Sequence, residues 1–192
     1  WNETVGYESM RWIYLRDYHK ENYECSKERF RLKGTRITLE EADTPTFIGV
    51  RQSEFDSELT VSVSGKAKEA GVTFYMDEQQ HYDLFRSVTA QGIKAVLRFH
   101  VGDAIMTAGE YAFEKASDAE QQSVQLKAVT REEYYEFYVI DGAKEVFLGK
   151  AQAKYLSSEV AGGFTGVVMG LYAVDEQENW AEFRDFYWKQ GQ

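Results

Sequence analysis

Apolar side chains occupy every second position through much of this chain, and this period of two constrains the fold more than any other sequence feature. Residues 58–64, 72–76, 92–101 and 124–129 all show it. Since successive side chains of a β-strand point to opposite faces, such runs predict half-buried strands. Roughly a dozen candidate strands follow one another at short spacing, which favours an all-β sandwich or jelly roll.

Two runs depart from strict alternation. FTGVVMGLYAV (164–174) is continuously apolar. This predicts a central strand buried on both faces, with Gly166 and Gly170 where backbone or ligand comes close. The aromatic-rich run WAEFRDFYW (180–188) predicts a last strand that lies near the first.

Turn and loop signals separate the strands. Asp141-Gly142 lies between two alternating runs in EFYVIDGAKEVFLG, and this pair predicts a tight hairpin with a type I′ turn. Residues 114–122 (EKASDAEQQ) are polar and predict a loop. Pro45 is the single proline, and no Pro- or Ser-rich linker divides the chain. Residues 1–192 are therefore expected to form one domain.

The chain begins at Trp1 with no initiator Met, basic region or apolar leader, so we expect it to be a fragment of a longer protein. No apolar run approaches the ~20 residues that a membrane span needs. The net charge is −10, from 32 acidic and 22 basic residues. Nucleic acids and anionic membranes bind clustered Lys and Arg, so we expect neither as a partner. A sugar or another protein remains possible as the binding partner.

Cysteine and histidine carry little signal. Cys25 is the only cysteine, so no intrachain disulfide is possible, which fits a reducing compartment such as the cytoplasm, and the thiol is expected to be inert. His19, His81 and His100 stand alone in the sequence, with no HExxH or CxxC motif. Each is predicted to be a surface or packing residue, and no metal ligand is assigned. No cofactor is expected, although a structural calcium ion stays open, with Asp185 as a candidate ligand.

The stretch EFDSE (54–58) raises a catalytic hypothesis. On a strand, Glu54, Asp56 and Glu58 would project from one face, opposite to the core-facing residues 59–63. Alternate positions lie about 6.6–6.8 Å apart along a strand. A retaining glycosidase needs its two carboxyl groups about 5–5.5 Å apart, which twist or a bulge can reach. The acids are therefore either a catalytic pair, Glu54 and Glu58, or solvated side chains.

Six longer runs occur in a fixed order along the chain. The runs are RWIYLRD (11–17), ERFRLKG (28–34), TPTFIGVRQSEF (44–55), EAGVTFYMDEQQHYDLF (69–85), GGFTGVVMGLYA (162–173) and WAEFRDFYW (180–188). Together they resemble the C-terminal concanavalin A-like β-sandwich of β-xylosidases in glycoside hydrolase family 43. The resemblance covers nearly the whole chain.

The resemblance implies a jelly-roll sandwich of two antiparallel sheets that contains no catalytic residue. In that family, an N-terminal five-bladed propeller carries the carboxylates that hydrolyse the glycosidic bond. The sandwich packs on the propeller, and one of its loops places an aromatic side chain in the substrate pocket. Phe55, after Arg51-Gln52, matches that aromatic residue. The resemblance thus implies two partners: a propeller on the same polypeptide and, through it, a xylo- or arabino-oligosaccharide.

Three hypotheses follow. The first is a non-catalytic accessory module of a β-xylosidase or α-arabinofuranosidase, with Phe55 as the substrate-binding residue and an exposed apolar docking patch around residues 47–56. The second is an independent carbohydrate-binding module. The third is a jelly-roll retaining glycosidase that uses Glu54 and Glu58. Phe55 itself has two possible positions. The resemblance places it in a loop that reaches the substrate pocket, whereas its parity with Leu59 would bury it in the core if the strand extended that far.

Overall fold

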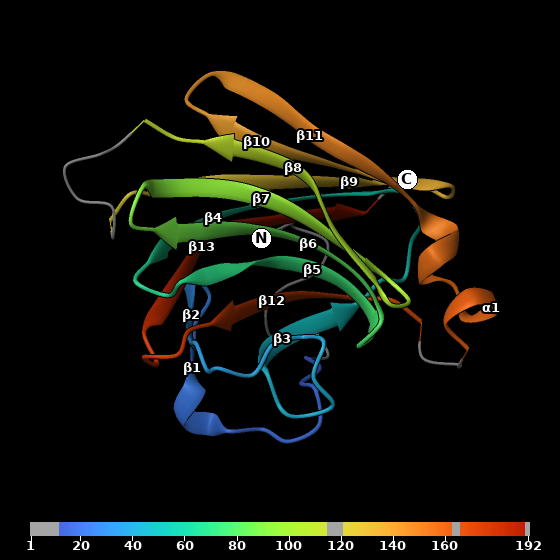
Figure 1. Ribbon diagram of the computed structural model, residues 1–192, viewed down its shortest axis with the longest axis horizontal. Coiled ribbons are helices and arrows are strands. Elements are labelled where there is room, and N and C mark those ends of the chain that lie inside the picture. The colour runs from blue at the N-terminus through green and yellow to red at the C-terminus, as the bar shows by residue number, and fades with distance from the viewer. Residues whose placement is uncertain (1–11, 115–120, 163–165, 191–192) are drawn as a thin grey trace.

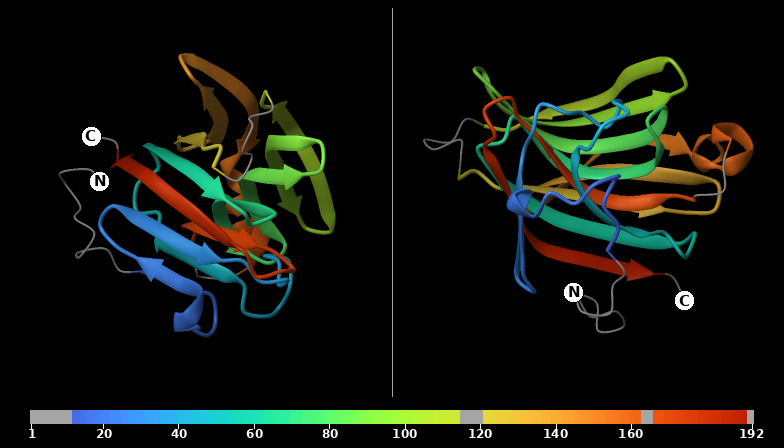
Figure 2. Two further views of the ribbon diagram at one scale, coloured as in Figure 1. Left: turned by 90° about the vertical axis from the view of Figure 1, so that its left-hand side faces the viewer. Right: turned by 90° about the horizontal axis from the view of Figure 1, so that it is seen from below.

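The chain forms two stacked antiparallel sheets (Figures 1 and 2). The computed structural model describes residues 12–114, 121–162 and 166–190, and these ranges contain thirteen strands. The seven-stranded sheet has the order β1-β2-β13-β4-β9-β10-β11, and the six-stranded sheet has the order β3-β12-β5-β6-β7-β8. The predicted all-β sandwich of two antiparallel sheets is thus confirmed.

The elements have the following bounds. The strands are β1 (Tyr23–Cys25), β2 (Arg29–Lys33), β3 (Thr46–Arg51), β4 (Ser57–Gly65), β5 (Glu69–Asp77), β6 (Gln80–Thr89), β7 (Gly92–Val101), β8 (Ala104–Ala112), β9 (Val124–Thr130), β10 (Tyr134–Asp141), β11 (Lys144–Gln152), β12 (Val168–Val174) and β13 (Trp180–Gln190). One short helix, α1, spans Ser158–Ala161, and 3₁₀ turns span Lys20–Asn22 and Ala153–Leu156. None of the described helices is long and apolar enough to cross a membrane.

The main core lies between the sheets and follows the period of two. On β4, Leu59, Val61 and Val63 are buried, while the residues between them are only partly buried. Inward-facing side chains from the other strands of both sheets complete this core. The largest of them include Phe30, Phe74, Tyr82, Phe137 and Phe183.

A second apolar cluster covers the other face of the six-stranded sheet. It contains Leu39, Phe47, Tyr75, Phe85, Val96, Val168 and Tyr172, and Ile13 and Leu15 pack against it. Ile13 also pairs with Gly49 through two backbone hydrogen bonds of 2.8 and 2.9 Å. The central strands of this sheet are therefore buried on both faces. Residues 47–50 are buried as well, whereas residues 51 and 53–56 are exposed and Phe55 is the apolar side chain among them, so the apolar docking patch predicted at 47–56 is reduced to Phe55.

Residues 168–174 of the predicted apolar run form β12, which lies between β3 and β5 and is buried from Val168 to Ala173. A Cβ on Gly170 would lie 2.1 Å from the Phe47 ring, so this glycine allows the close approach that the sequence predicts. The last strand, β13, pairs with β2 and β4, and β2 in turn pairs with β1. Both strand predictions are confirmed.

The predicted hairpin joins β10 to β11, but its turn differs from the prediction. Asp141 pairs with Lys144, so the turn residues are Gly142 and Ala143. Gly142 has a φ of 60°, whereas Ala143 is not among the residues with positive φ. A type I′ turn requires positive φ at both central positions, so that assignment is wrong. Most of the predicted loop at 114–122 lies outside the described residues.

Candidate functional site

The loop between β3 and β4 presents Phe55 to solvent. The strand begins at Ser57, so Glu54 and Asp56 lie in the loop and only Glu58 lies on the strand. The expectation that the three acids share one strand face is therefore wrong. Phe55 is 67% exposed, which rules out the core position that strand parity would have given it.

Buried polar groups tie this loop to β9 and β10. The Thr130 hydroxyl donates to the Phe55 carbonyl at 2.5 Å and accepts from the Ser57 N–H at 3.1 Å. Gln52 donates to the Glu54 carbonyl at 3.0 Å and accepts from the Tyr135 hydroxyl at 2.9 Å. Burial raises the pKa of Tyr135, so its hydroxyl keeps the proton that it donates. The exposed aromatic ring therefore stands on a constrained backbone.

Phe55 borders a hollow of about 880 Å³ at the end of the sandwich where α1 lies (Figure 1). Three further segments line it: the β9–β10 connection, the end of β11 with the turn that follows, and the residues before β12. The lining mixes apolar and charged side chains. It includes Glu54, Arg131, Glu132, Glu133, Tyr134, Tyr135, Lys150, Lys154, Leu156 and Val167.

The hypothesised catalytic pair does not meet in this hollow. Glu54 lines it, whereas Glu58 lies on β4 with its side chain 44% exposed and 3.9 Å from Lys127 Nζ. A retaining mechanism needs both carboxyl groups at one sugar ring. The geometry therefore does not support the third hypothesis.

The hollow also offers little free aromatic surface. Lys150 Nζ lies 3.2 Å from the centroid of the Tyr134 ring, so one face of that ring is covered. Tyr135 is buried beneath the loop. Phe55 is the exposed aromatic ring at the rim, among the described residues that line the hollow.

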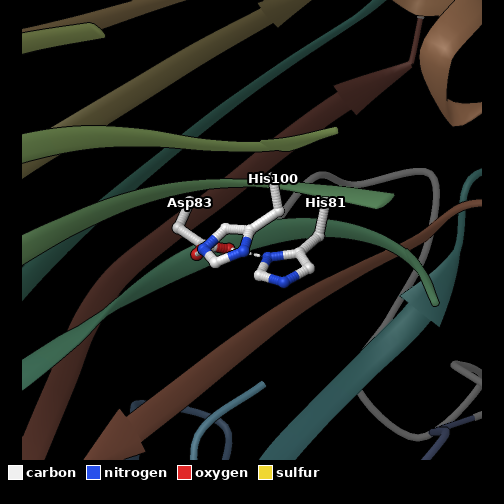
Figure 3. Close-up of side chains that lie close together, drawn as sticks. All are labelled: His81, Asp83 and His100. Carbon is white, nitrogen blue, oxygen red and sulfur yellow. Dashed lines mark hydrogen bonds and ion pairs between the residues drawn. The ribbon is translucent and has the colours of Figure 1, made fainter. Parts of the chain in front are cut away.

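A second polar cluster lies under the cover of the six-stranded sheet. His81 on β6 pairs in register with His100 on β7, and their rings stack with centroids 3.9 Å apart. Asp83 lies two residues after His81 on the same face, and its Oδ1 is 2.8 Å from His81 Nδ1 (Figure 3). All three side chains are buried.

Arg98 and Glu69 extend this cluster. Nε and Nη2 of Arg98 donate to Asp83 Oδ2 at 3.2 and 3.0 Å, and the guanidinium also donates to Glu69 at 3.0 and 2.5 Å. Burial alone would raise the pKa of Asp83, but His81 and Arg98 outweigh it and hold the pKa well below its usual range. Burial, reinforced by His81, lowers the pKa of His100 to about 4.

Sequence reasoning missed this cluster because it took each histidine by itself. The available signal was the strand pairing. His81 and Asp83 are two residues apart on β6, and the β6–β7 hairpin in the observed register places His100 beside them. Pairing register follows from the turn between the strands, which the search for short motifs did not use.

The other singled-out residues stand apart from both sites. His19 is exposed, with Nδ1 3.7 Å from Glu21. Burial raises the pKa of Cys25 to about 11, which keeps the thiol protonated and unreactive. Asp185 is exposed on a bulge of β13 with a φ of 52°. Lys27, Glu28 and Arg184 line the hollow beside it, and a structural calcium ion at Asp185 stays a prediction.

Comparison with known proteins points to one family. A family model described as the beta xylosidase C-terminal concanavalin A-like domain matches residues 7–189. A curated non-reducing end alpha-L-arabinofuranosidase, BoGH43B of Bacteroides ovatus, is 30% identical over 192 residues. That alignment covers 97% of this chain and 35% of the relative.

Solved structures show the same architecture. The structure of the Bacteroides ovatus xyloglucan PUL GH43B matches with a TM-score of 0.83 at 28% identity, covering 99% of this chain and 38% of that one. The GH43 protein BlXynB of Bacillus licheniformis matches with a TM-score of 0.80 at 18% identity, covering 94% of this chain and 37% of that one. The chain thus spans little more than a third of the length of these relatives.

Proposed function

The chain belongs to the family of β-xylosidase C-terminal concanavalin A-like domains, and from this premise we propose that it is a non-catalytic accessory module of a β-xylosidase or α-arabinofuranosidase. In this proposal a catalytic propeller precedes it on the same polypeptide, and the module packs against that propeller. The relatives support a larger protein, because each is nearly three times as long as the part that matches.

We further propose that Phe55 closes one side of the propeller's substrate pocket. The observation that carries this step is an exposed aromatic ring on a backbone held by partly buried hydrogen bonds. Contact between an exposed Phe ring and water is unfavourable, so burying the ring against a partner is favourable. A loop that is already held by hydrogen bonds loses little conformational entropy when the partner covers it. Xylo- or arabino-oligosaccharides are the proposed substrates, and the sugar ring would pack its apolar face on Phe55.

The test of this role is Phe55→Ala in the full-length enzyme. We expect KM to rise and kcat/KM to fall by about tenfold or more, since one lost methylene contact in a pocket is already worth about 1–3 kcal/mol. Phe147→Ala is the matched control, because Phe147 is 54% exposed on β11 and does not line the hollow. Equal kinetics for the two variants would refute the pocket role.

An independent carbohydrate-binding module is the second candidate, and the hollow beside Phe55 is the observation in its favour. The covered face of Tyr134 counts against it, because sugar platforms need open ring faces. Calorimetric titration of the 192-residue chain with xylo-oligosaccharides separates the two. We expect no measurable binding by the chain alone, whereas saturable binding that is lost in Phe55→Ala would favour the second candidate.

A further inference from the structure

The six-stranded sheet ends in an edge strand, β8, that is exposed along much of its length (Figure 1). Among the described residues, β8 pairs only with β7. Residues 104–108 are all exposed, and the exposed fractions of Ile105 and Met106 are 61% and 49%. These two side chains lie on opposite faces of the strand. We propose that β8 is an interaction surface on which a second copy of this chain pairs in the antiparallel direction, with Ile105 at the centre of the contact.

The other three sheet edges among the described strands are protected against such pairing. Edge strands usually avoid it by short length, charged side chains or a covering segment. β1 has only three residues, and Ile13 pairs with β3 at Gly49. β11 carries the exposed charges of Lys144, Glu145 and Lys150. Each of these edges is therefore a poor template for a further strand.

The first half of β8 lacks this protection. Residues 104–109 (AIMTAG) contain no charged residue and no proline. The register with β7 shifts at Ala108, so the strand bulges there, and a bulge turns an edge away from a partner. The part of the edge that is regular, neutral and exposed is therefore 104–107.

The backbone of this regular part offers hydrogen bonds to a partner strand. β7 and β8 are joined by a two-residue turn, so Val101 and Ala104 form the first pair of the ladder. Such a pair exchanges both backbone hydrogen bonds, and the pairs that follow alternate between bonded and non-bonded. The N–H and C=O groups of Ile105 and Thr107 therefore point away from β7. A row of such groups on an edge is a template for another strand.

The side chains suit a contact of β8 with its own copy. A two-fold axis at Ile105 places this residue opposite itself, so the two exposed side chains would bury each other. Ala104 then lies opposite Met106, a small residue facing a large one. Asp103 lies opposite Thr107, so no like charges face each other, which would destabilise the pair. The run is thus complementary to itself in size and charge, as a two-fold contact requires.

The contact is short, and two copies that each carry a net charge of −10 repel each other. Interfaces below about 1,200 Å² are typical of weak and transient contacts. We therefore expect a dimer that forms reversibly at high protein concentration. Salt screens the repulsion between exposed charges but leaves apolar and backbone contacts largely unchanged, so added salt should strengthen the dimer. This inference does not depend on the proposed accessory function.

Sedimentation velocity of the 192-residue chain over a wide range of concentrations tests the proposal. We expect the chain to shift from monomer to dimer as its concentration rises, and to a larger dimer fraction at higher ionic strength. Ile105→Lys should leave the chain monomeric at every concentration, because two lysines would lie directly opposite each other. Phe147→Lys is the matched control, since Phe147 is similarly exposed on another edge strand, β11, and this variant should associate as the unchanged chain does.

Hydrogen exchange identifies the surface that pairs. In the unchanged chain, the amides of Ile105 and Thr107 should exchange more slowly at high than at low protein concentration. In Ile105→Lys, the exchange rates should not depend on concentration. Both lysine substitutions are at exposed positions and should leave the fold intact.

Three results would overturn the proposal. The first is a chain that stays monomeric at every concentration and ionic strength. The second is a dimer that persists in Ile105→Lys, because another surface would then make the contact. The third is protection of the Ile105 amide that does not change with concentration, because another part of the same chain would then cover this edge.

Discussion

Polar side chains hold both the Phe55 loop and the His81–Asp83–His100 cluster, but the groups that they bond to differ. In the loop, neutral side chains of Gln52 and Thr130 bond to backbone groups as well as to one another, and the side chain that reaches solvent is apolar. In the cluster, charged side chains bond to one another beneath a covering segment. Hydrogen bonds to the backbone fix the path of a loop, whereas buried charged pairs set the local electrostatics. The two regions should therefore respond differently to substitution.

The largest expected effect is at Asp83. Asp83→Asn removes a fully buried charge and leaves Arg98 and His81 without their carboxylate. Breaking a buried pair in this way costs about 3–5 kcal/mol of unfolding free energy. Urea denaturation of the 192-residue chain measures this loss of unfolding free energy.

Glu110→Gln is the matched comparison for Asp83→Asn. Glu110 pairs with Lys94 on the same sheet, but both side chains are exposed. Exposed pairs contribute about 0–1 kcal/mol. Similar losses for the two variants would contradict the distinction between a buried and an exposed carboxylate.

A smaller effect is expected at the base of the loop. Thr130→Val removes the hydroxyl that serves both the Phe55 carbonyl and the Ser57 N–H. Leaving these groups unpaired should cost about 1–3 kcal/mol, measured by the same denaturation. Thr107→Val, at an exposed position on β8, should stay within about 0.5 kcal/mol. A neutral Thr130→Val would show that the loop does not depend on this hydroxyl.

Phe55→Ala should change the stability of the chain by no more than about 0.5 kcal/mol, because the ring is mostly in solvent. Phe74→Ala in the core should cost about 3–5 kcal/mol and serves as the reference. Thermal and urea unfolding of both variants test this difference. A large loss for Phe55→Ala would mean that the ring packs on the sandwich and is not available to a pocket.

The smallest expected effect concerns the acids beside Phe55. The 192-residue chain should not hydrolyse aryl xylosides or arabinosides, because Glu54 and Glu58 lie in different surroundings. Glu54→Gln and Glu58→Gln should therefore leave a chromogenic assay at its background. Turnover by the unchanged chain that either substitution abolishes would restore the glycosidase hypothesis.

Most of the fold could be predicted from the sequence, because buried apolar residues recur at every second position along the strands. Leu59, Val61 and Val63 predicted the core face of β4, and the continuous apolar run at 164–174 predicted β12. The details of individual turns were predicted less accurately. The hairpin at Gly142 was expected, but which residues occupy the turn depends on how β10 and β11 pair.

The candidate sites divide in the same way. The resemblance of neighbouring motifs predicted an exposed Phe55, which the structure shows, although strand parity alone would have buried it; its substrate-binding role stays a prediction. Where β4 begins is decided by the bonds of Ser57 and Gln52 to Thr130, which lies 73 residues from Ser57. Period-two reasoning has no access to such a contact.

By itself, the sequence determined the all-β class, the inward faces of the strands and the family, because these depend on patterns between neighbours in the chain. Only the tertiary structure decided which polar residues meet. His81 and His100 are 19 positions apart, and Glu40, whose Oε1 lies 3.2 Å from His100 Nε2, comes from a segment outside the sheet. Their contact depends on strand register and layer packing, which are cooperative properties of the folded chain, so no single stretch of sequence encodes it.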